Sequence, residues 1–366
     1  MKIEKDLRKD GITAIEPLDM LSVTLISKFV AEKLSSALPF YNLKYHDLFV
    51  KISRISMYVA DIPEGMSEAN YFYKNSAIYF KRGLTLEQMQ KFAVHEFIHN
   101  IQELKDKKNI LYRLGLCDFT GFKIYGMALN EGAVQLLSSK VLKNDMESVK
   151  YYGIEFSTIS PNCYPIICNL VKQMAYITGE DILFDSTLYS NDKFKNSFIK
   201  LCGEKQFYKC QDNLDVISNA EEKILHTNAK LQKEKLSDSA IAKYAKQIYN
   251  CKKLITSTFI DTQNLIFTSY FTNSLNNIYS VQDIEDFRKK LYNYRDLLGT
   301  TENYFYFNDF YIDMMAKLDV KYEFITGNNY MVEYKPSFIE LLLSKVKKVF
   351  GLGSLEYEKN NDYYNK

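Results

Sequence analysis

The sequence has no tryptophan, only four histidines and no C-x-x-C pair among its six cysteines. Unpaired cysteines scattered through 366 residues predict reduced, mostly buried thiols in a cytoplasmic protein. A Cys202–Cys210 disulfide formed after secretion is the alternative that the spacing leaves open. The six cysteines are Cys117, Cys163, Cys168, Cys202, Cys210 and Cys251.

The chain also lacks a long apolar run and an excess of one charge. No stretch of about 18 apolar residues occurs, so no membrane-spanning helix is expected. The charged N-terminus "MKIEKDLRKDG" is not followed at once by an apolar core, so no signal peptide is expected, and export without such a signal stays open. A net charge of +2 gives no electrostatic reason to expect a nucleic-acid partner.

What the chain does have is the composition of a folded protein, with 46% hydrophobic and 25% charged residues. Residues 18–38 have helical apolar spacing. Residues 47–60 are β-branched and partly alternating, which predicts a strand. One or two further strands are expected in "YFYKNSAIYFKRG", which closes at Gly83. The sequence therefore predicts an α+β fold with a small mixed sheet in its N-terminal half.

Two helices are expected after this sheet. Thr85 and Gln88 have capping-box spacing and predict a helix over about 86–106. A loop is expected to follow as far as residue 122, and a second helix over 123–143. After about residue 145 the pattern is nearly all helical, and the expected helices are 164–179 ended by Gly179, 237–259, 280–299 capped by Ser280, and 336–350 with a Ser337/Glu340 capping box.

The first of these two helices carries "KFAVHEFIHNIQ", residues 91–102, which holds two of the four histidines. His95 and His99 lie on one helix face, about 6 Å apart along the axis, so both imidazoles can converge on one cation. Glu96 points about 100° away and can reach a water held by the metal. This spacing is the H-E-x-x-H pattern of zinc sites, and the competing interpretation is two ordinary polar histidines at a core edge.

A zinc site with two imidazoles needs a third protein ligand. Gln102 and Lys105 stand where the longer H-E-x-x-H-x-x-G-x-x-H pattern needs glycine and histidine. Glu103 lies about 12 Å along the axis from His95, too far to share a small ion. His46 and His226 have no motif around them.

Glu131, in "ALNEGAVQ" of the next helix, is the best remaining candidate for the third ligand. Ala128 and Gly132 are small and four residues apart, so a neighbouring helix can approach closely there. Asn130 and Gln135 are candidates to hydrogen-bond the ligands. The alternative is a capping or salt-bridging glutamate beside a packing glycine.

"HEFIH" followed by "LNEG" resembles the gluzincin metallopeptidases, and "LNEGA" is similar to the W-L-N-E-G-F-A segment of the M1 aminopeptidase-like family. The likeness covers about residues 50–145. It implies that His95, His99 and Glu131 bind one Zn²⁺ per chain and that Glu96 is the general base.

The resemblance also implies a zincin-like catalytic domain over 1–180, in which "NSAIYFKRG" (75–83) resembles the edge strand that pairs with substrate. A helical domain over 181–350 and a polar tail over 351–366 would follow. Gluzincins add a residue that hydrogen-bonds the oxyanion. Four residues stay open for this role: Tyr151, Tyr152, Tyr164 and His226.

The favoured function is a zinc-dependent metallopeptidase acting on a peptide or protein substrate. The alternative is an inactive zincin-like protein that binds partners through its helical half. The segment 337–350 has a basic amphipathic face, which either packs on its own domain or lies on an anionic membrane surface. Substrate, endo- or exo-action and oligomeric state are not encoded in any pattern found here.

Overall fold

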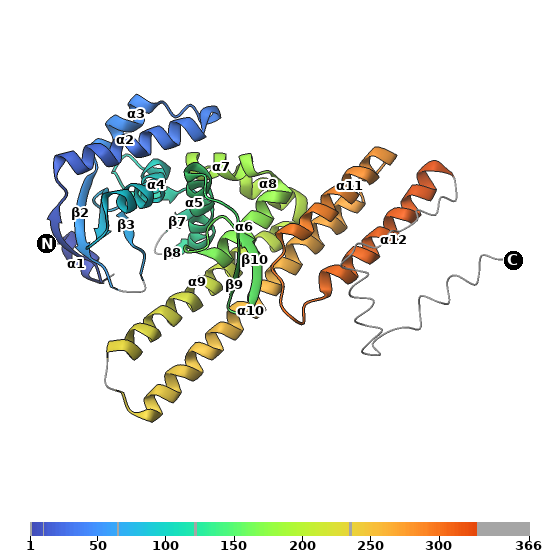
Figure 1. Ribbon diagram of the computed structural model, residues 1–366. Coiled ribbons are helices and arrows are strands. Elements are labelled where there is room, and N and C mark those ends of the chain that lie inside the picture. The colour runs from blue at the N-terminus through green and yellow to red at the C-terminus, as the bar shows by residue number, and fades with distance from the viewer. Residues whose placement is uncertain (1, 10, 64–65, 121–122, 234–235, 328–366) are drawn as a thin grey trace.

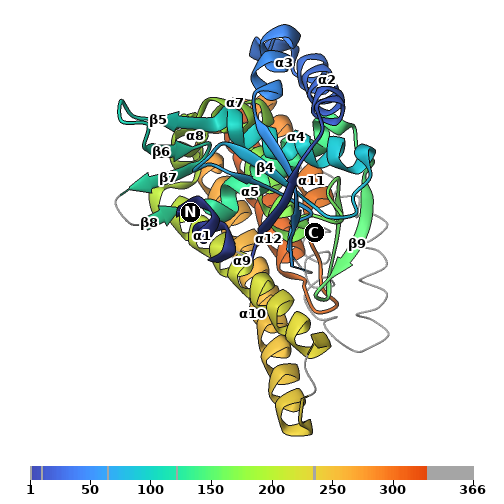
Figure 2. The ribbon, with the colours of Figure 1, turned by 90° about the vertical axis from the view of Figure 1, so that its left-hand side faces the viewer.

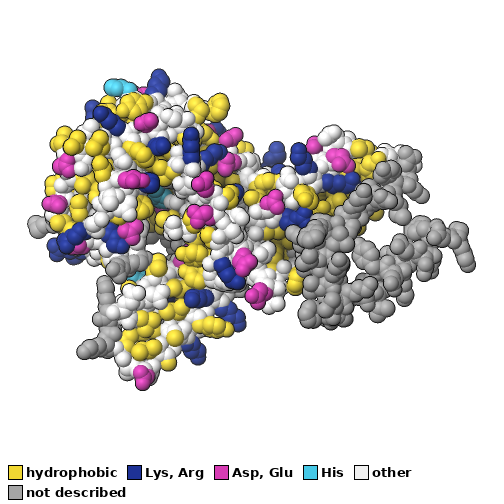
Figure 3. Space-filling model, viewed as in Figure 1, with side chains coloured by type: hydrophobic (Ala, Val, Ile, Leu, Met, Phe, Trp, Pro, Cys, Tyr) yellow, Lys and Arg dark blue, Asp and Glu magenta, His cyan; other side chains and the backbone are white. Residues whose placement is uncertain are grey.

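The computed structural model describes residues 2–9, 11–63, 66–120, 123–233 and 236–327. The fold is α+β, as predicted, with three small sheets near the N-terminal side and a helical C-terminal region. Figure 1 shows the sheets and first helices grouped at one end, and two long helices that project from this body. On the face shown in Figure 3, acidic and basic side chains are interspersed over the described residues.

The first sheet has four strands in the spatial order β1 (Thr13–Pro17), β2 (Ser56–Asp61), β4 (Ala77–Lys81) and β3 (Ala69–Phe72). Strands β2 and β4 are parallel, and β3 runs antiparallel to β4 at the edge of the sheet. Strand β4 therefore lies inside the sheet. The prediction that residues 75–83 form the edge strand is wrong, because β3 takes that position.

Helices α2 (Met20–Ala37) and α3 (Tyr45–Ser53) pack against each other above the sheet (Figure 1). Helix α2 confirms the prediction for 18–38, with Asp19 as its N-cap. The predicted strand over 47–60 is wrong in its first half, which is α3. Leu48 and Ile52, one helical turn apart, are buried, and this stripe outweighs the β-propensity of the segment.

Helix α4 (Leu86–Gln102) carries the histidine motif and begins with the predicted capping box. Gln88 N donates to Thr85 Oγ1 at 3.3 Å, and Thr85 N donates to Gln88 Oε1 at 2.9 Å. The helix ends at Gln102 and not near 106, because residues 103–105 enter a second sheet.

This second sheet is an antiparallel meander where the sequence predicted a loop. Its strands are β5 (Glu103–Lys105), β6 (Leu111–Leu114), β7 (Cys117–Thr120) and β8 (Lys123–Tyr125). Strands of three or four residues are too short to show a hydrophobic period, so their pairing depends on neighbouring strands and not on a local pattern.

Helix α5 (Met127–Leu142) lies beside α4 and corresponds to the predicted helix over 123–143. The hairpin of β9 (Glu147–Tyr151) and β10 (Ile154–Thr158) follows it and interrupts the region predicted to be nearly all helical. Helix α6 (Pro165–Thr178) then ends at Gly179, as predicted.

The remaining helices form the C-terminal region. Helices α9 and α10 pack side by side and extend away from the body as an arm (Figures 1 and 2). Ser280 caps α11 through a capping box, as predicted, and α11 ends at Tyr294 before a short 3-10 turn. These elements are α7 (Glu180–Tyr189), α8 (Lys193–Cys202), α9 (Glu204–Lys233), α10 (Asp238–Leu275), α11 (Val281–Tyr294), η2 (Arg295–Leu297) and α12 (Tyr306–Thr326); α1 (Lys2–Lys9) and η1 (Pro39–Tyr41) lie near the N-terminus.

The main hydrophobic core draws residues from α2 to α12, and a smaller core lies between α1 and residues of β2, β3 and β4. All six cysteines are free thiols and five of them are buried, including Cys202 and Cys210. None of the described helices is long and apolar enough to cross a membrane. The helix predicted over 336–350 and the tail over 351–366 lie outside the described residues, and the domain boundary near 180 stays a prediction.

Candidate metal centre

Helix α4 presents two different faces. Its apolar side chains, including Val94, Phe97 and Ile98, are fully buried in the main core. His95, Glu96 and His99 line a cleft of about 360 Å³ on another side of the helix. Core packing of the first set fixes the rotation of α4 and so aims the second set into the cleft.

Three side chains converge in this cleft, two from α4 and one from α5. His95 Nε2 lies 3.4 Å from Glu131 Oε2, and His99 Nε2 lies 3.4 Å from Glu131 Oε1. The two imidazole Nε2 atoms are 3.1 Å apart. Ligand atoms about 2.0–2.1 Å from a tetrahedral ion are about 3.3 Å from one another. The three groups are thus spaced as a tetrahedral metal ion requires, and they form a group that can hold one.

Each imidazole is oriented by a glutamine. His95 Nδ1 donates to Gln135 Oε1 at 2.8 Å, and His99 Nδ1 donates to Gln102 Oε1 at 3.2 Å. A carbonyl oxygen can only accept, so each Nδ1 carries a proton and each Nε2 is the nitrogen that faces the other two groups. A cation bound there takes the place of any proton on Nε2. This is the tautomer that metal binding through Nε2 requires.

The two glutamines are held in turn by buried polar groups. Gln102 Nε2 donates to Asn130 Oδ1 at 3.2 Å, and Gln135 Nε2 donates to Ser160 Oγ at 2.9 Å. Gly115 makes room for the Gln102–Asn130 pair: its φ is +59°, and a Cβ there would lie 2.2 Å from Asn130 Oδ1. Gln102 is missed by sequence reasoning as a supporting residue, although a polar residue three positions after a ligand histidine is a usable signal.

The three converging groups shift one another's proton affinities in the metal-free structure. Burial opposes the charge on His99, but the Glu131 carboxylate outweighs burial and raises the pKa of His99 to about 9. Burial also opposes the charge on Glu131, and His99 and His95 together hold the pKa of Glu131 well below its usual range. The Glu131 carboxylate is therefore ionised and available to a cation.

Glu96 stands beside the three converging groups without joining them. Its Oε2 accepts a hydrogen bond from Tyr71 N of the edge strand β3 at 2.6 Å. Burial raises the pKa of Glu96, while the imidazoles of His95 and His99 oppose this shift. A buried carboxylate with a raised pKa, next to a cation site, is suited to exchange a proton near neutral pH.

Strand β3 forms one wall of the cleft. Lys81 N donates to Glu68 O at 2.9 Å, so the main-chain groups of Glu68, and by alternation those of Asn70 and Phe72, face β4. The main-chain groups of Ala69 and Tyr71 therefore face the cleft. They form the outer edge of the sheet along the side of the proposed metal site, where Tyr71 N–H is bonded to Glu96 and no main-chain partner is recorded among the described residues for the other groups.

The structure separates the remaining candidates. Tyr164 lines the same cleft as His95, His99 and Glu131, and the Glu131 carboxylate is the largest cause of the pKa of Tyr164 being raised well above its usual value. Tyr151 and Tyr152, around the β9–β10 turn, do not line the cleft. His226 pairs with Glu222 on the exposed side of α9.

Two other expectations have clear outcomes. Glu103 bonds Tyr71 Oη and Lys105, away from the centre, as its distance along the helix predicts. The close approach at Gly132 is real, but its partner is α6 and not α4: a Cβ there would meet Ile167 Cγ2 at 2.8 Å. The proposed reason for Glu131 reaching α4 is therefore wrong.

Comparison with known proteins adds no identification. The chain matches no protein-family model, no curated protein sequence and no solved structure. The geometry of the site itself is therefore the basis for a function.

Proposed function

We propose that this protein is a zinc-dependent metallopeptidase with a gluzincin-like ligand set, His95, His99 and Glu131. The observation that carries the proposal is that the two Nε2 atoms lie 3.1 Å apart and each lies 3.4 Å from one oxygen of Glu131, with both Nδ1 protons tied to glutamines. Two imidazoles and one carboxylate are a donor set typical of catalytic zinc, and a fourth position faces the cleft. The likeness of "HEFIH" and "LNEGA" to gluzincins supports the same assignment.

Zinc bound there would polarise a peptide carbonyl and lower the pKa of a bound water to about 7. Glu96 takes the proton of the attacking water and passes it to the leaving amine. The hydrogen bond from Tyr71 N fixes the Glu96 carboxylate, so the base needs no reorientation before the proton moves. Its raised pKa suits both halves of this transfer.

Two further elements of the cleft fit a peptide substrate. The outer edge of β3 offers the main-chain N–H and C=O of Ala69 and the C=O of Tyr71 for pairing with an extended substrate backbone, while Tyr71 N–H stays bonded to Glu96. The Tyr164 hydroxyl is the best placed of the four candidates to donate a hydrogen bond to the oxygen that becomes negative. We place the protein in the cytoplasm, because its free, mostly buried thiols suit a reducing compartment.

Metal analysis and one substitution test the proposal. Purified protein should contain one zinc per chain, and Glu96→Gln should keep that zinc while losing hydrolysis of a mixed peptide library followed by mass spectrometry. The matched control is Glu103→Gln, which removes another buried carboxylate at the end of the same helix without touching the centre. Protein without bound metal refutes the zinc site, and zinc without Glu96-dependent cleavage favours an inactive zinc-binding module.

A further inference from the structure

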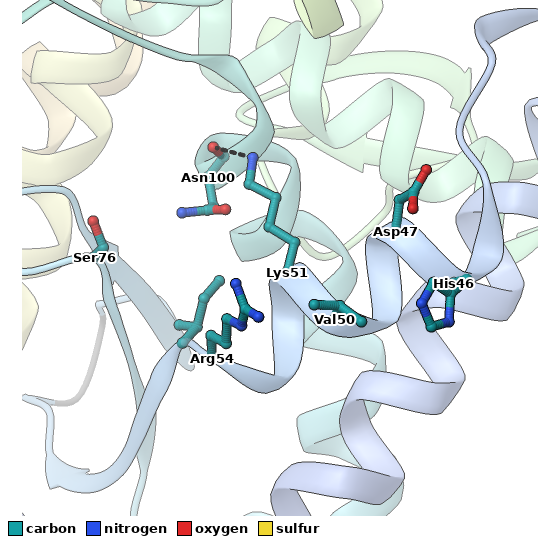
Figure 4. A pocket seen from close by; sticks show the side chains of 8 residues that line it. His46, Asp47, Val50, Lys51, Arg54, Ser76 and Asn100 are labelled. Atoms are coloured by element: carbon teal, nitrogen blue, oxygen red, sulfur yellow. Dashed lines mark hydrogen bonds between the residues drawn. The ribbon is translucent and has the colours of Figure 1, made fainter.

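A second pocket lies on the other side of the α4–β3 contact from the cleft. It has a volume of about 460 Å³ and is walled by one face of α3, the β3–β4 turn and α4. Figure 4 shows Lys51, Arg54, Ser76 and Asn100 around one part of it, with His46 and Asp47 further along α3. We call it the α3 pocket, defined by these residues; none of them belongs to the proposed metal centre.

Two cations of the α3 pocket have no acidic partner in direct contact. Lys51 lies on α3 and Arg54 follows its last residue, one turn on, and within the described residues neither is within ion-pair distance of a carboxylate. Lys51 Nζ instead donates to the backbone oxygen of Asn100 at 3.2 Å (Figure 4), which leaves two of its three donors unused. Burial lowers the pKa of Lys51 more than the Glu103 carboxylate raises it.

Asn100 supplies a group of the opposite kind. Its side chain is buried, and Asn100 Oδ1 has no hydrogen-bond partner among the described residues. The other end of the amide is committed, because Asn100 Nδ2 donates to Tyr71 Oη at 2.8 Å and Tyr71 Oη donates to Glu103. These bonds fix the orientation of the amide, so Oδ1 stays an unsatisfied acceptor.

From these groups we propose that the α3 pocket binds a small oxyanion that carries a hydrogen-bond donor of its own. The anionic oxygens are held by Lys51 and Arg54, and the donor satisfies Asn100 Oδ1. Hydroxy-carboxylates, amino acids and hydrogen phosphate share this chemistry, whereas acetate and sulfate have the charge without the donor at neutral pH. The proposal does not depend on the peptidase assignment.

Two hydrogen bonds connect the α3 pocket to the cleft. The Tyr71 hydroxyl accepts a hydrogen bond from Asn100 Nδ2, and the Tyr71 backbone N–H donates one to Glu96 Oε2. A ligand bound at Asn100 is therefore two hydrogen bonds away from the Glu96 carboxylate, through Tyr71.

Isothermal titration calorimetry on the full zinc-loaded chain tests the proposal with matched probe pairs. Glycolate should bind about five-fold more tightly than acetate, and inorganic phosphate about five-fold more tightly than sulfate, because one hydrogen bond separates the members of each pair. The double variant Lys51→Met/Arg54→Met should weaken glycolate and phosphate binding about a hundred-fold or abolish it. Arg54→Met alone, which removes an exposed side chain, should weaken binding about ten-fold.

Two controls separate this site from general charge effects and from the metal. Lys200→Met/Lys205→Met removes the same charge from exposed positions on α8 and α9 and should leave binding unchanged. Repeating the titration after zinc removal should also leave it unchanged. Binding that disappears with the zinc, binding that survives Lys51→Met/Arg54→Met, or no heat from glycolate or phosphate overturns the proposal.

Discussion

Two buried polar networks in this protein look similar in composition and differ in geometry. The amide network, made of Asn169, Gln173, Gln263 and Tyr294, joins α6, α10 and α11. The metal-centre network, made of His95, His99, Glu131 and their glutamines Gln102 and Gln135, joins α4 and α5. Both are buried or nearly so; the amide network connects helices far apart in the sequence, and the metal-centre network connects two consecutive helices.

The amide network is closed, because its donors meet acceptors within the protein. Gln263 Oε1 accepts from Gly299 N and from Gln173 Nε2, and Gln263 Nε2 donates to Gly299 O. Tyr294 Oη donates to Gln173 Oε1 at 2.8 Å. Such a network holds helices in register and leaves nothing to bind a ligand.

The metal-centre network is open. Its hydrogen bonds orient His95 and His99 from behind, and their lone pairs then meet a carboxylate from α5 at the wall of a cleft. Buried polar residues therefore do not by themselves indicate function. Convergence of three metal-ligand side chains on one point is what distinguishes the proposed metal-binding network from the amide network.

Removing a ligand should break this comparison most strongly. Glu131→Ala removes the proposed third zinc ligand. Zinc affinity should therefore fall by more than the roughly 100-fold that is typical when an outer hydrogen bond to a metal ligand is lost. Peptide hydrolysis should fall with it. Zinc content after dialysis and competition with a chromogenic chelator measure the effect; His226→Ala, on the exposed side of α9, is the matched control. Full zinc content in Glu131→Ala would refute its role as a ligand.

Removing a supporting glutamine should have a smaller effect on the same measurement. Gln135→Leu leaves His95 Nδ1 without its acceptor, so the imidazole loses its fixed tautomer and orientation. Zinc affinity should fall about 10- to 100-fold, as for other outer hydrogen bonds to metal ligands. Gln173→Leu in the amide network serves as the control and should leave zinc affinity unchanged.

A substitution in the amide network tests the same comparison through the stability of the protein instead of its zinc affinity. Gln263→Leu orphans the main-chain N–H and C=O of Gly299. Each buried group left without a partner costs about 1–3 kcal/mol, so the free energy of unfolding should fall by about 3 kcal/mol. Urea denaturation measures this loss. A variant as stable as the parent protein would show that water replaces these bonds.

The smallest effect concerns pH in the metal-free protein. His99 has a folded pKa of about 9, above its ordinary value of 6.5, so its contribution is complete below pH 6.5 and is lost as pH rises towards 9. The folded pKa of Glu131 is lowered, so its contribution is present above its ordinary value of 4.5 and is lost as pH falls. The melting temperature should therefore decline on the alkaline side, and His99→Gln should flatten that decline; equal declines in both proteins would contradict the shift.

The sequence by itself determined the local part of the site. His95, Glu96 and His99 follow from helical spacing, and the Thr85–Gln88 box predicted where their helix begins, because both depend on residues within one or two turns. Glu131 was also found from sequence, through its chemistry and the resemblance of its segment. The close approach inferred for Gly132 was real, but sequence could not say that its partner is α6.

Only the tertiary structure decided which elements meet. It placed β3 and not β4 at the sheet edge, turned residues 45–53 into a helix against α2, and built a meander from residues 103–125. It also brought Gln102 into hydrogen-bond contact with His99, and Tyr71 into hydrogen-bond contact with both Glu96 and Asn100. The physical reason is that strand pairing and side-chain contacts join residues distant in sequence, whose competition no local period records.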